Sequence, residues 1–256
     1  MKKIYLAALT LAMTACVSND DLNPADNYGY IDVNVSNDPV MVTRAEGDPN
    51  WIITATKNSS DYTEYTFKLG SNHVPAGTYV ITAKSHANVA AANTTSDWGE
   101  AYYEGRSNSV TISAGQPGTA TINCGKAKNS RIKANFSLQG EQFKEFSITL
   151  TQNDKSLTIN NDNANNYAYF SAGTVSFTFH YKYGSSTDEK NIQSSITCVA
   201  GTEHHINITS DDNGTITLNI SFDNTFTNGG DKTITFNAAT GEKVSETDTT
   251  PTTPSN

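Results

Sequence analysis

Residues 97–106, with the sequence DWGEAYYEGR, form the segment best suited to recognising a ligand. Trp98, Tyr102 and Tyr103 offer aromatic faces, and acidic side chains lie beside them in the sequence. Aromatic rings stack on the C–H faces of sugars, while carboxylates accept hydrogen bonds from sugar hydroxyl groups. The segment therefore predicts a ligand-binding site at Trp98, Tyr102 and Tyr103. The alternative is an edge strand whose aromatic side chains cover one end of a β-sandwich.

The other residues capable of chemistry show no spacing typical of a catalytic or metal site. His204 and His205 are adjacent, so on a strand they point to opposite faces and do not share a metal easily. Residues 211–214 (DDNG) lack the alternating acidic residues and distant Glu of a calcium loop, and predict a hairpin turn. The sequence holds no nucleophile elbow, CxxC pair or phosphate loop. We therefore expect surface histidines, no metal, no cofactor, no catalytic residue and no enzymatic activity.

The N-terminus predicts a lipoprotein signal. Two lysines precede an apolar run over 4–13 that is shorter than the roughly 20 residues needed to span a bilayer. The next residues, MTAC at 13–16, resemble the bacterial lipobox, where a peptidase cuts before a cysteine that carries a diacylglyceryl group. This resemblance implies lipidation of Cys16, because several acyl chains give stable membrane anchoring. The alternative is an ordinary signal peptide followed by a chance cysteine.

Acidic residues outnumber basic ones, giving a net charge of −9 that becomes −11 if Lys2 and Lys3 leave with the signal. An acidic surface repels phosphate backbones, so we expect no nucleic-acid partner. Asp20 and Asp21 lie close behind Cys16 and resemble the export signal of surface lipoproteins in gut Bacteroidetes. That resemblance implies the outer face of the outer membrane. A generic solvated tether is the alternative.

Apolar and polar residues alternate along most of the chain, as expected for strands. One apolar face beside one polar face is typical of an antiparallel sheet with one side in water. No segment shows a convincing 3.6-residue stripe, so the predicted fold is all-β. The predicted strand segments are 31–35, 51–55, 65–69, 79–83, 110–112, 120–122, 132–138, 146–150, 175–181, 206–208, 216–222 and 234–236.

The two halves of the chain resemble each other. PAGTYVIT at 75–82 parallels SAGTVSFT at 171–178, and SVTISAG at 109–115 parallels SITCVAG at 195–201. We interpret these landmarks as two related Ig-like β-sandwich domains, with chance similarity of turn-rich sequence as the alternative. The predicted divisions are a signal peptide at 1–15, a lipid-anchored tether at 16–27, domain 1 at 28–127, domain 2 at 128–240 and a disordered Thr/Pro-rich tail at 241–256.

Cys124 and Cys198 each lie on the apolar side of a predicted strand, in different predicted domains. A disulfide is chemically allowed in an exported protein. Because the two cysteines fall in separate domains, we expect two buried free thiols instead.

Several motifs together resemble the DUF4493 family of Bacteroides lipoproteins. The most specific are the AGTY of 76–79 and the YYEG of 102–105, and the resemblance extends roughly from Tyr28 to Phe236. The family is similar to fimbrillin-type surface proteins, which implies paired transthyretin-like antiparallel β-sandwiches behind a lipobox. By that analogy we expect a non-catalytic adhesion or fimbria-like assembly module, with the membrane and a surface protein or glycan as partners. The alternative is a glycan-binding lipoprotein that assists polysaccharide capture at the outer membrane.

Overall fold

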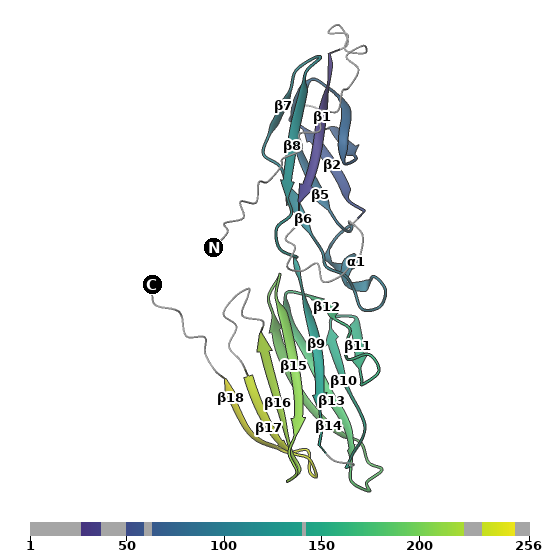
Figure 1. Ribbon diagram of the computed structural model, residues 1–256, viewed down its shortest axis with the longest axis vertical. Helices are drawn as coiled ribbons and strands as arrows, with labels where there is room; N and C mark the ends of the chain where they lie inside the picture. Colours follow the sequence, from purple (N-terminus) through teal and green to yellow (C-terminus); the bar gives the residue numbers. More distant parts are fainter. Residues whose placement is uncertain (1–26, 37–49, 59–62, 140–141, 223–231, 249–256) are drawn as a thin grey trace, which may run out of the picture.

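The computed structural model describes residues 27–36, 50–58, 63–139, 142–222 and 232–248. The described chain forms two β-sandwiches, stacked one above the other along the long axis of the molecule (Figure 1). Residues 1–26, including Cys16 and its lipobox, lie outside the described part, so the lipid anchor stays a prediction. No described helix has the length and apolar character needed to cross a membrane.

The first sandwich consists of a three-stranded sheet facing a five-stranded one. The smaller sheet has the order β4-β1-β8, and the larger has the order β3-β2-β5-β6, with β7 also paired to β5. The strand bounds are β1 Tyr28–Ser36, β2 Ile52–Lys57, β3 Thr63–Phe67, β4 Gly70–Pro75, β5 Gly77–Lys84, β6 Glu104–Arg106, β7 Val110–Ile112 and β8 Pro117–Asn123.

The second sandwich consists of a six-stranded sheet facing a four-stranded one. Their orders are β12-β9-β15-β16-β17-β18 and β11-β10-β13-β14. The strand bounds are β9 Asn129–Ser137, β10 Phe143–Gln152, β11 Lys155–Ile159, β12 Ala168–Ser171, β13 Gly173–Tyr183, β14 Lys190–Cys198, β15 Glu203–Ser210, β16 Thr215–Phe222, β17 Lys232–Asn237 and β18 Lys243–Asp248.

Each sandwich has its own hydrophobic core. Residues that alternate along the strands fill these cores, because successive side chains point to opposite faces of a sheet. Ile31 and Ile81 belong to the first core, and Ile132 and Phe179 belong to the second. All four side chains are fully buried. Each predicted strand segment overlaps a strand, which confirms that alternation located the core.

The two sandwiches share one strand arrangement. The order β4-β1-β8 recurs as β12-β9-β15, and β3-β2-β5 recurs as β11-β10-β13. This common topology confirms the duplication that the sequence landmarks predicted. One expectation needs correction, because β1 pairs with β8 in parallel and β9 pairs with β15 in parallel. The two sheets that contain these pairs are therefore mixed, since the chain crosses to the opposite sheet between the paired strands and can return in the same direction.

The predicted disordered tail begins too early. Residues 243–248 form β18, which pairs antiparallel with β17 at the edge of the six-stranded sheet. All six residues of β18 are exposed, so the strand shows no apolar alternation to reveal it. Backbone pairing and ion pairs from Lys232 and Lys243 to Glu246 hold it instead. Residues 249–256 lie outside the described part of the chain.

Two local predictions are confirmed. Asp211 to Gly214 forms the turn of the β15–β16 hairpin, although only Gly214 adopts a positive φ, of 75°. The carboxylate of Asp211 accepts from the backbone N–H groups of Asn213 and Thr215, which fixes the turn. Cys124 and Cys198 are both free and buried.

Candidate functional site

The three aromatic residues of the predicted ligand site do not form one exposed surface. Tyr102 and Tyr103 are each only 4 % exposed, and Tyr103 packs in the first core. Trp98 is half-buried and packs against the second core. The expectation of accessible aromatic faces is therefore wrong for both tyrosines, and the geometry favours the packing alternative. Sequence pattern missed this because one aromatic segment divides its side chains between two cores.

The segment from Asn88 to Tyr103, which we call the junction segment, connects β5 to β6 and reaches the second sandwich. It begins with α1 (Val89–Thr94), a helix of six residues whose N-cap Asn88 accepts from the N–H of Ala91 at 2.9 Å. This helix is too short to produce the 3.6-residue stripe that was absent from the sequence. It contacts β12 of the second sandwich, so the segment bridges the two domains.

Two asparagines at the junction form a buried hydrogen-bond network. Asn129, at the start of β9, donates to Oδ1 of Asn93 at 2.9 Å and to the carbonyl of Glu100 at 2.7 Å. Its own Oδ1 accepts from the N–H of Tyr102 at 2.9 Å. Asn93 in turn donates to Oγ of Ser171, on β12, at 2.9 Å. Buried polar groups of this kind specify one arrangement, because breaking any bond leaves an unpaired group.

Lys155, at the start of β11, connects the same elements from the other side. Its ammonium donates to the backbone carbonyls of Asn93 at 2.6 Å, Trp98 at 3.1 Å and Tyr169 at 2.9 Å. Three acceptors match the three donors of a lysine ammonium. Burial lowers the pKa of Lys155 to about 8, and the negative charge of Asp97 opposes that shift. One side chain thus joins the junction segment to β12.

Gly99 permits this close approach. Its φ is +83°, and a Cβ at this position would lie 2.8 Å from the carbonyl oxygen of Asn93 and 2.9 Å from the Cβ of Tyr169. Tyr169 also donates its backbone N–H to the carbonyl of Trp98 at 2.8 Å. Any side chain at Gly99 would push the junction segment away from β12.

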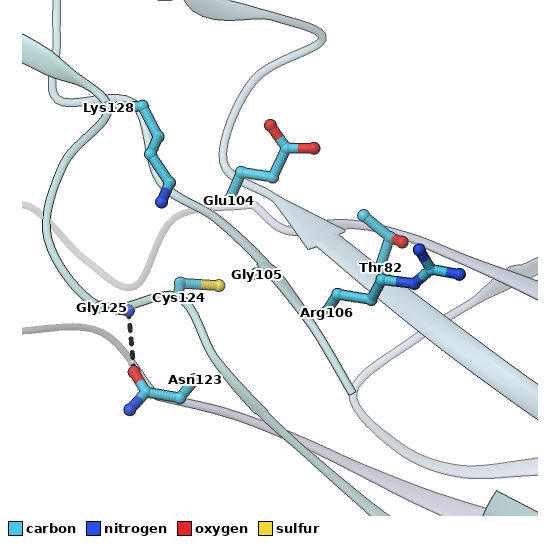
Figure 2. A pocket seen from close by; sticks show the side chains of 8 residues that line it. All are labelled: Thr82, Glu104, Gly105, Arg106, Asn123, Cys124, Gly125 and Lys128. Carbon is cyan, nitrogen blue, oxygen red and sulfur yellow. Dashed lines mark hydrogen bonds between the residues drawn. The ribbon is translucent and has the colours of Figure 1, made fainter. Parts of the chain in front are cut away.

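A pocket opens at the end of the first sandwich nearest the linker. Its volume is about 760 Å³, within the usual range of small-ligand sites. Figure 2 shows Lys128 and Glu104 on either side of the Cys124 thiol, with Arg106 beside Thr82 across the pocket. Strands β5, β6 and β8 and the linker after β8 therefore supply its walls.

The backbone at this pocket is shaped by two glycines. A Cβ on Gly105 would lie 2.6 Å from the carbonyl oxygen of Asn123, so only glycine lets β6 approach the end of β8. Gly125 has a φ of +55°, and its N–H donates to Oδ1 of Asn123 at 2.8 Å (Figure 2). This turn directs the chain from β8 into the linker that carries Lys128.

Charged side chains of both signs face the pocket. Glu104 accepts from the hydroxyl of Tyr102 at 2.8 Å and pairs with Lys84 at 3.5 Å. Burial raises the pKa of the Cys124 thiol to about 11, with the charge of Lys128 lowering it and that of Glu104 raising it. The thiol of Cys124 therefore stays protonated. The charges of Lys128 and Glu104 both act on the pocket beside it.

A buried ion pair anchors the first strand of the second sandwich. Arg131 on β9 and Glu203 on β15 are directly paired across the parallel ladder and are 3 % and 6 % exposed. Nε of Arg131 donates to Glu203 at 2.8 Å, and the ring of Tyr167 lies 4.2 Å from the guanidinium carbon. Burial favours a raised pKa for Glu203, but hydrogen bonds from His205 and Arg131 lower it to about 2.

The burial of His204 and His205 depends on their positions along β15. His204 is fully buried, so its predicted surface location is wrong, while His205 pairs with Glu203 at 2.8 Å. Their side chains therefore occupy opposite faces of β15, as adjacent strand residues do. Within the described residues, no three His, Cys, Asp or Glu side chains gather as a metal site would require.

Sequence analysis missed the polar residues that organise this region. Asn93, Asn129 and Lys155 are ordinary polar residues in the sequence, and their partners lie up to 78 positions away. The available signal was the polar run of 129–131 at the start of an otherwise alternating strand. Lys128 of the pocket carried no motif, and Arg106, although it ends the 97–106 segment, was given no role of its own.

Comparisons with known proteins place the chain in a family. The model of the family described as a domain of unknown function, DUF4493, matches residues 49–238, and no curated protein matches the chain. A crystal structure of a candidate cell-adhesion protein from Bacteroides thetaiotaomicron is 11 % identical, with a TM-score of 0.37, over 70 % of this chain and 91 % of that one.

The pilus adhesin SpaC of Lactobacillus rhamnosus GG, in its open conformation, is 12 % identical, with a TM-score of 0.32, over 75 % of this chain and 27 % of that one. Both TM-scores are too low to carry a conclusion about function. The family match, in contrast, covers most of the chain. This chain therefore belongs to the DUF4493 family.

Proposed function

We propose that this chain is a non-catalytic adhesion or assembly module, displayed on the cell surface through a lipid on Cys16. The observation that carries the proposal is the junction between the sandwiches. Asn93, Asn129 and Lys155 hold the two domains in one stacked arrangement through buried hydrogen bonds. A stiff tandem of domains projects a binding surface away from the membrane and transmits force between its ends.

Exposed strand edges support the assembly aspect of the proposal. Among the described strands, β8 ends the smaller sheet of the first sandwich, with Thr119, Thr121 and Asn123 exposed along it. Unpaired N–H and C=O groups on such an edge accept a strand from another protein. The second sandwich extends the equivalent strand, β15, with β16, β17 and β18.

Glycan capture through Trp98, Tyr102 and Tyr103 is less well supported, because two of these side chains are buried. A surface module is expected to find its partners outside the cell.

Cross-linking on intact native cells, followed by identification of the attached proteins, tests the proposal. We expect capture of other β-sandwich or pilin-like surface proteins, and loss of that capture when Cys16→Ala releases the chain from the membrane. Capture of an outer-membrane transporter with glycan-processing partners would support nutrient capture instead. Continued membrane fractionation of Cys16→Ala with the same mature N-terminus would contradict the lipid anchor.

A further inference from the structure

The pocket beside Cys124 differs in charge from the rest of the protein. Lys128 and Arg106 contribute two positive charges and Glu104 one negative charge, whereas the whole chain carries a net charge of −9. Glu104 is already engaged by Lys84 and by the hydroxyl of Tyr102. Within the described part of the chain, neither Arg106 nor Lys128 has an ion-pair partner at its side chain. Two cations are therefore available to a ligand.

The pocket also offers neutral hydrogen-bonding groups. Thr82 contributes a hydroxyl and Asn123 contributes an amide, and Thr82 lies beside Arg106 (Figure 2). Glu104 is about 40 % exposed at its side chain, so its carboxylate keeps room to accept from a ligand hydroxyl. The lining therefore combines donors for an anion with groups that bind hydroxyls.

The combination of charges narrows the class of ligand. A carboxylate suits Arg106, because a planar guanidinium donates two parallel hydrogen bonds to it. A compact phosphate offers few hydroxyl groups to Glu104, and a neutral sugar leaves the Arg106 guanidinium without an anionic partner. A ligand that carries one carboxylate and several hydroxyl groups uses every part of the lining.

We propose that this pocket binds an acidic sugar, with the sugar carboxylate held by Arg106 beside Thr82 and the sugar hydroxyl groups held by Glu104, Lys128 and Asn123 across the pocket (Figure 2). Gly105 lets β6 approach the end of β8, and Gly125 turns the chain into the linker that carries Lys128. The inference rests on the proposed function, since it names the class of ligand that an adhesion module would hold. It places recognition at the linker end of the first sandwich and not on the aromatic segment.

Calorimetric titration of the chain from residue 17 onward, which contains every described residue, tests this inference. The probes are glucuronic acid and the neutral methyl glucoside. We expect binding of glucuronic acid with a Kd on the order of 1 mM or tighter, and at least roughly tenfold weaker binding of the neutral sugar. Arg106→Ala should weaken acid binding by about tenfold or more, because it removes a charge-assisted contact. Lys128→Ala should weaken it by a smaller factor, since an ammonium acts as a point charge.

Lys144→Ala is the matched control, because Lys144 is an exposed cation on β10 of the second sandwich. It removes the same charge and should leave the affinity unchanged. Arg106 and Lys128 are exposed, so their variants should fold, and a far-ultraviolet circular dichroism spectrum checks this. Equal binding of acid and neutral sugar, no binding of the acid, or equal effects of all three variants would overturn the inference.

The test separates this inference from the proposed function. Failure of the titration with continued capture of surface proteins on cells would remove the sugar site alone. Acid binding without any surface capture would keep the site and remove the assembly role.

Discussion

The two sandwiches share a topology but differ at the first residue pair of their parallel strands, which we call the rung. The rung is partly exposed in the first sandwich and buried in the second. In the first sandwich that rung pairs Tyr30 with Pro117, and Tyr30 is half-buried beside His73 with ring centroids 5.0 Å apart. In the second sandwich the same rung pairs Arg131 with Glu203, and both side chains are buried. Strands β1 and β9 run in the same direction along the long axis, so the sandwiches stack head to tail (Figure 1).

This difference follows from what lies beside each rung. The rung of the second sandwich lies near the linker. There the chain is closely packed, since a Cβ added to Gly201 would lie only 3.1 Å from the Cβ of Lys126. Polar groups that become buried must be paired, which an arginine and a glutamate achieve together. The rung of the first sandwich lies at the end far from the junction, where partly exposed rings cost little (Figure 1). The distance of a rung from the junction, more than the strand topology, therefore determines whether its residues are polar and paired.

The largest expected effect is on the buried rung. Arg131→Ala should destabilise the second sandwich by about 3–5 kcal/mol, because the buried Glu203 loses its arginine partner and keeps His205. Tyr30→Ala, at the matched position of the first sandwich, should cost about 1 kcal/mol or less. Urea denaturation with hydrogen exchange on β1 and β9 peptides measures both. Equal costs at the two rungs would remove the contrast between the sandwiches.

The same rung should make the second sandwich sensitive to acid. The pKa of Glu203 is about 2 in the folded protein, against a usual value near 4.5, so its carboxylate contributes stability at neutral pH. That contribution is fully present above about 4.5 and is lost as the pH falls toward 2. Glu203→Gln should lose this part of the pH dependence, and denaturation midpoints from pH 6 to pH 2 measure it.

Glu246 complicates that measurement, because hydrogen bonds from Lys232 and Lys243 also lower its pKa to about 2. The comparison is therefore made in a Glu246→Gln background. An unchanged pH profile on adding Glu203→Gln would show that the buried pair contributes nothing to acid sensitivity.

A smaller effect is expected at the junction that separates the two rungs. Lys155→Met keeps the length of the side chain but withdraws three donors from the carbonyls of Asn93, Trp98 and Tyr169. We expect a loss of roughly 1–3 kcal/mol and a wider range of domain orientations. Thermal denaturation and small-angle X-ray scattering measure the two effects, with the exposed Lys144→Met as control. Identical scattering curves for wild type and Lys155→Met would show that the lysine does not hold the junction.

The smallest effect is expected at β18, which has no counterpart among the described strands of the first sandwich. Glu246 pairs with Lys232 and Lys243 on an exposed edge, where solvent screening leaves ion pairs little effect on stability. Glu246→Ala should therefore barely change the unfolding midpoint but should speed hydrogen exchange in residues 243–248. A loss comparable with that of Arg131→Ala would mean that the added strands are essential to the second core.

The sequence predicted the parts of the fold that depend on alternation. Ile31, Ile132 and Phe179 were identified as core residues because a two-residue period is a local property of the chain. The duplication was also visible, since both copies keep the same glycine turn before β5 and β13. Strand β18 was missed because an exposed edge strand held by backbone pairing needs no apolar pattern.

The candidate site was much harder to predict. Trp98, Tyr102 and Tyr103 looked like one aromatic surface, yet Trp98 packs against the second core, Tyr103 packs in the first, and Tyr102 is buried outside both. The pocket was invisible because Arg106 on β6 and Lys128 in the linker come to line the same pocket only after the turn at Gly125. Polar contacts over long sequence separations leave no periodic signal.

The most direct test of the account is the distance between the two sandwiches in solution. Spin labels on Thr121→Cys and Asn219→Cys, at exposed positions of β8 and β16, allow pulsed electron resonance to measure it. Cys124 and Cys198 should not react, because burial raises the pKa of each thiol to about 11. A single narrow distance that broadens in Lys155→Met is the predicted result. A broad distribution in the unmodified junction would contradict the claim that the two sandwiches form one stiff module.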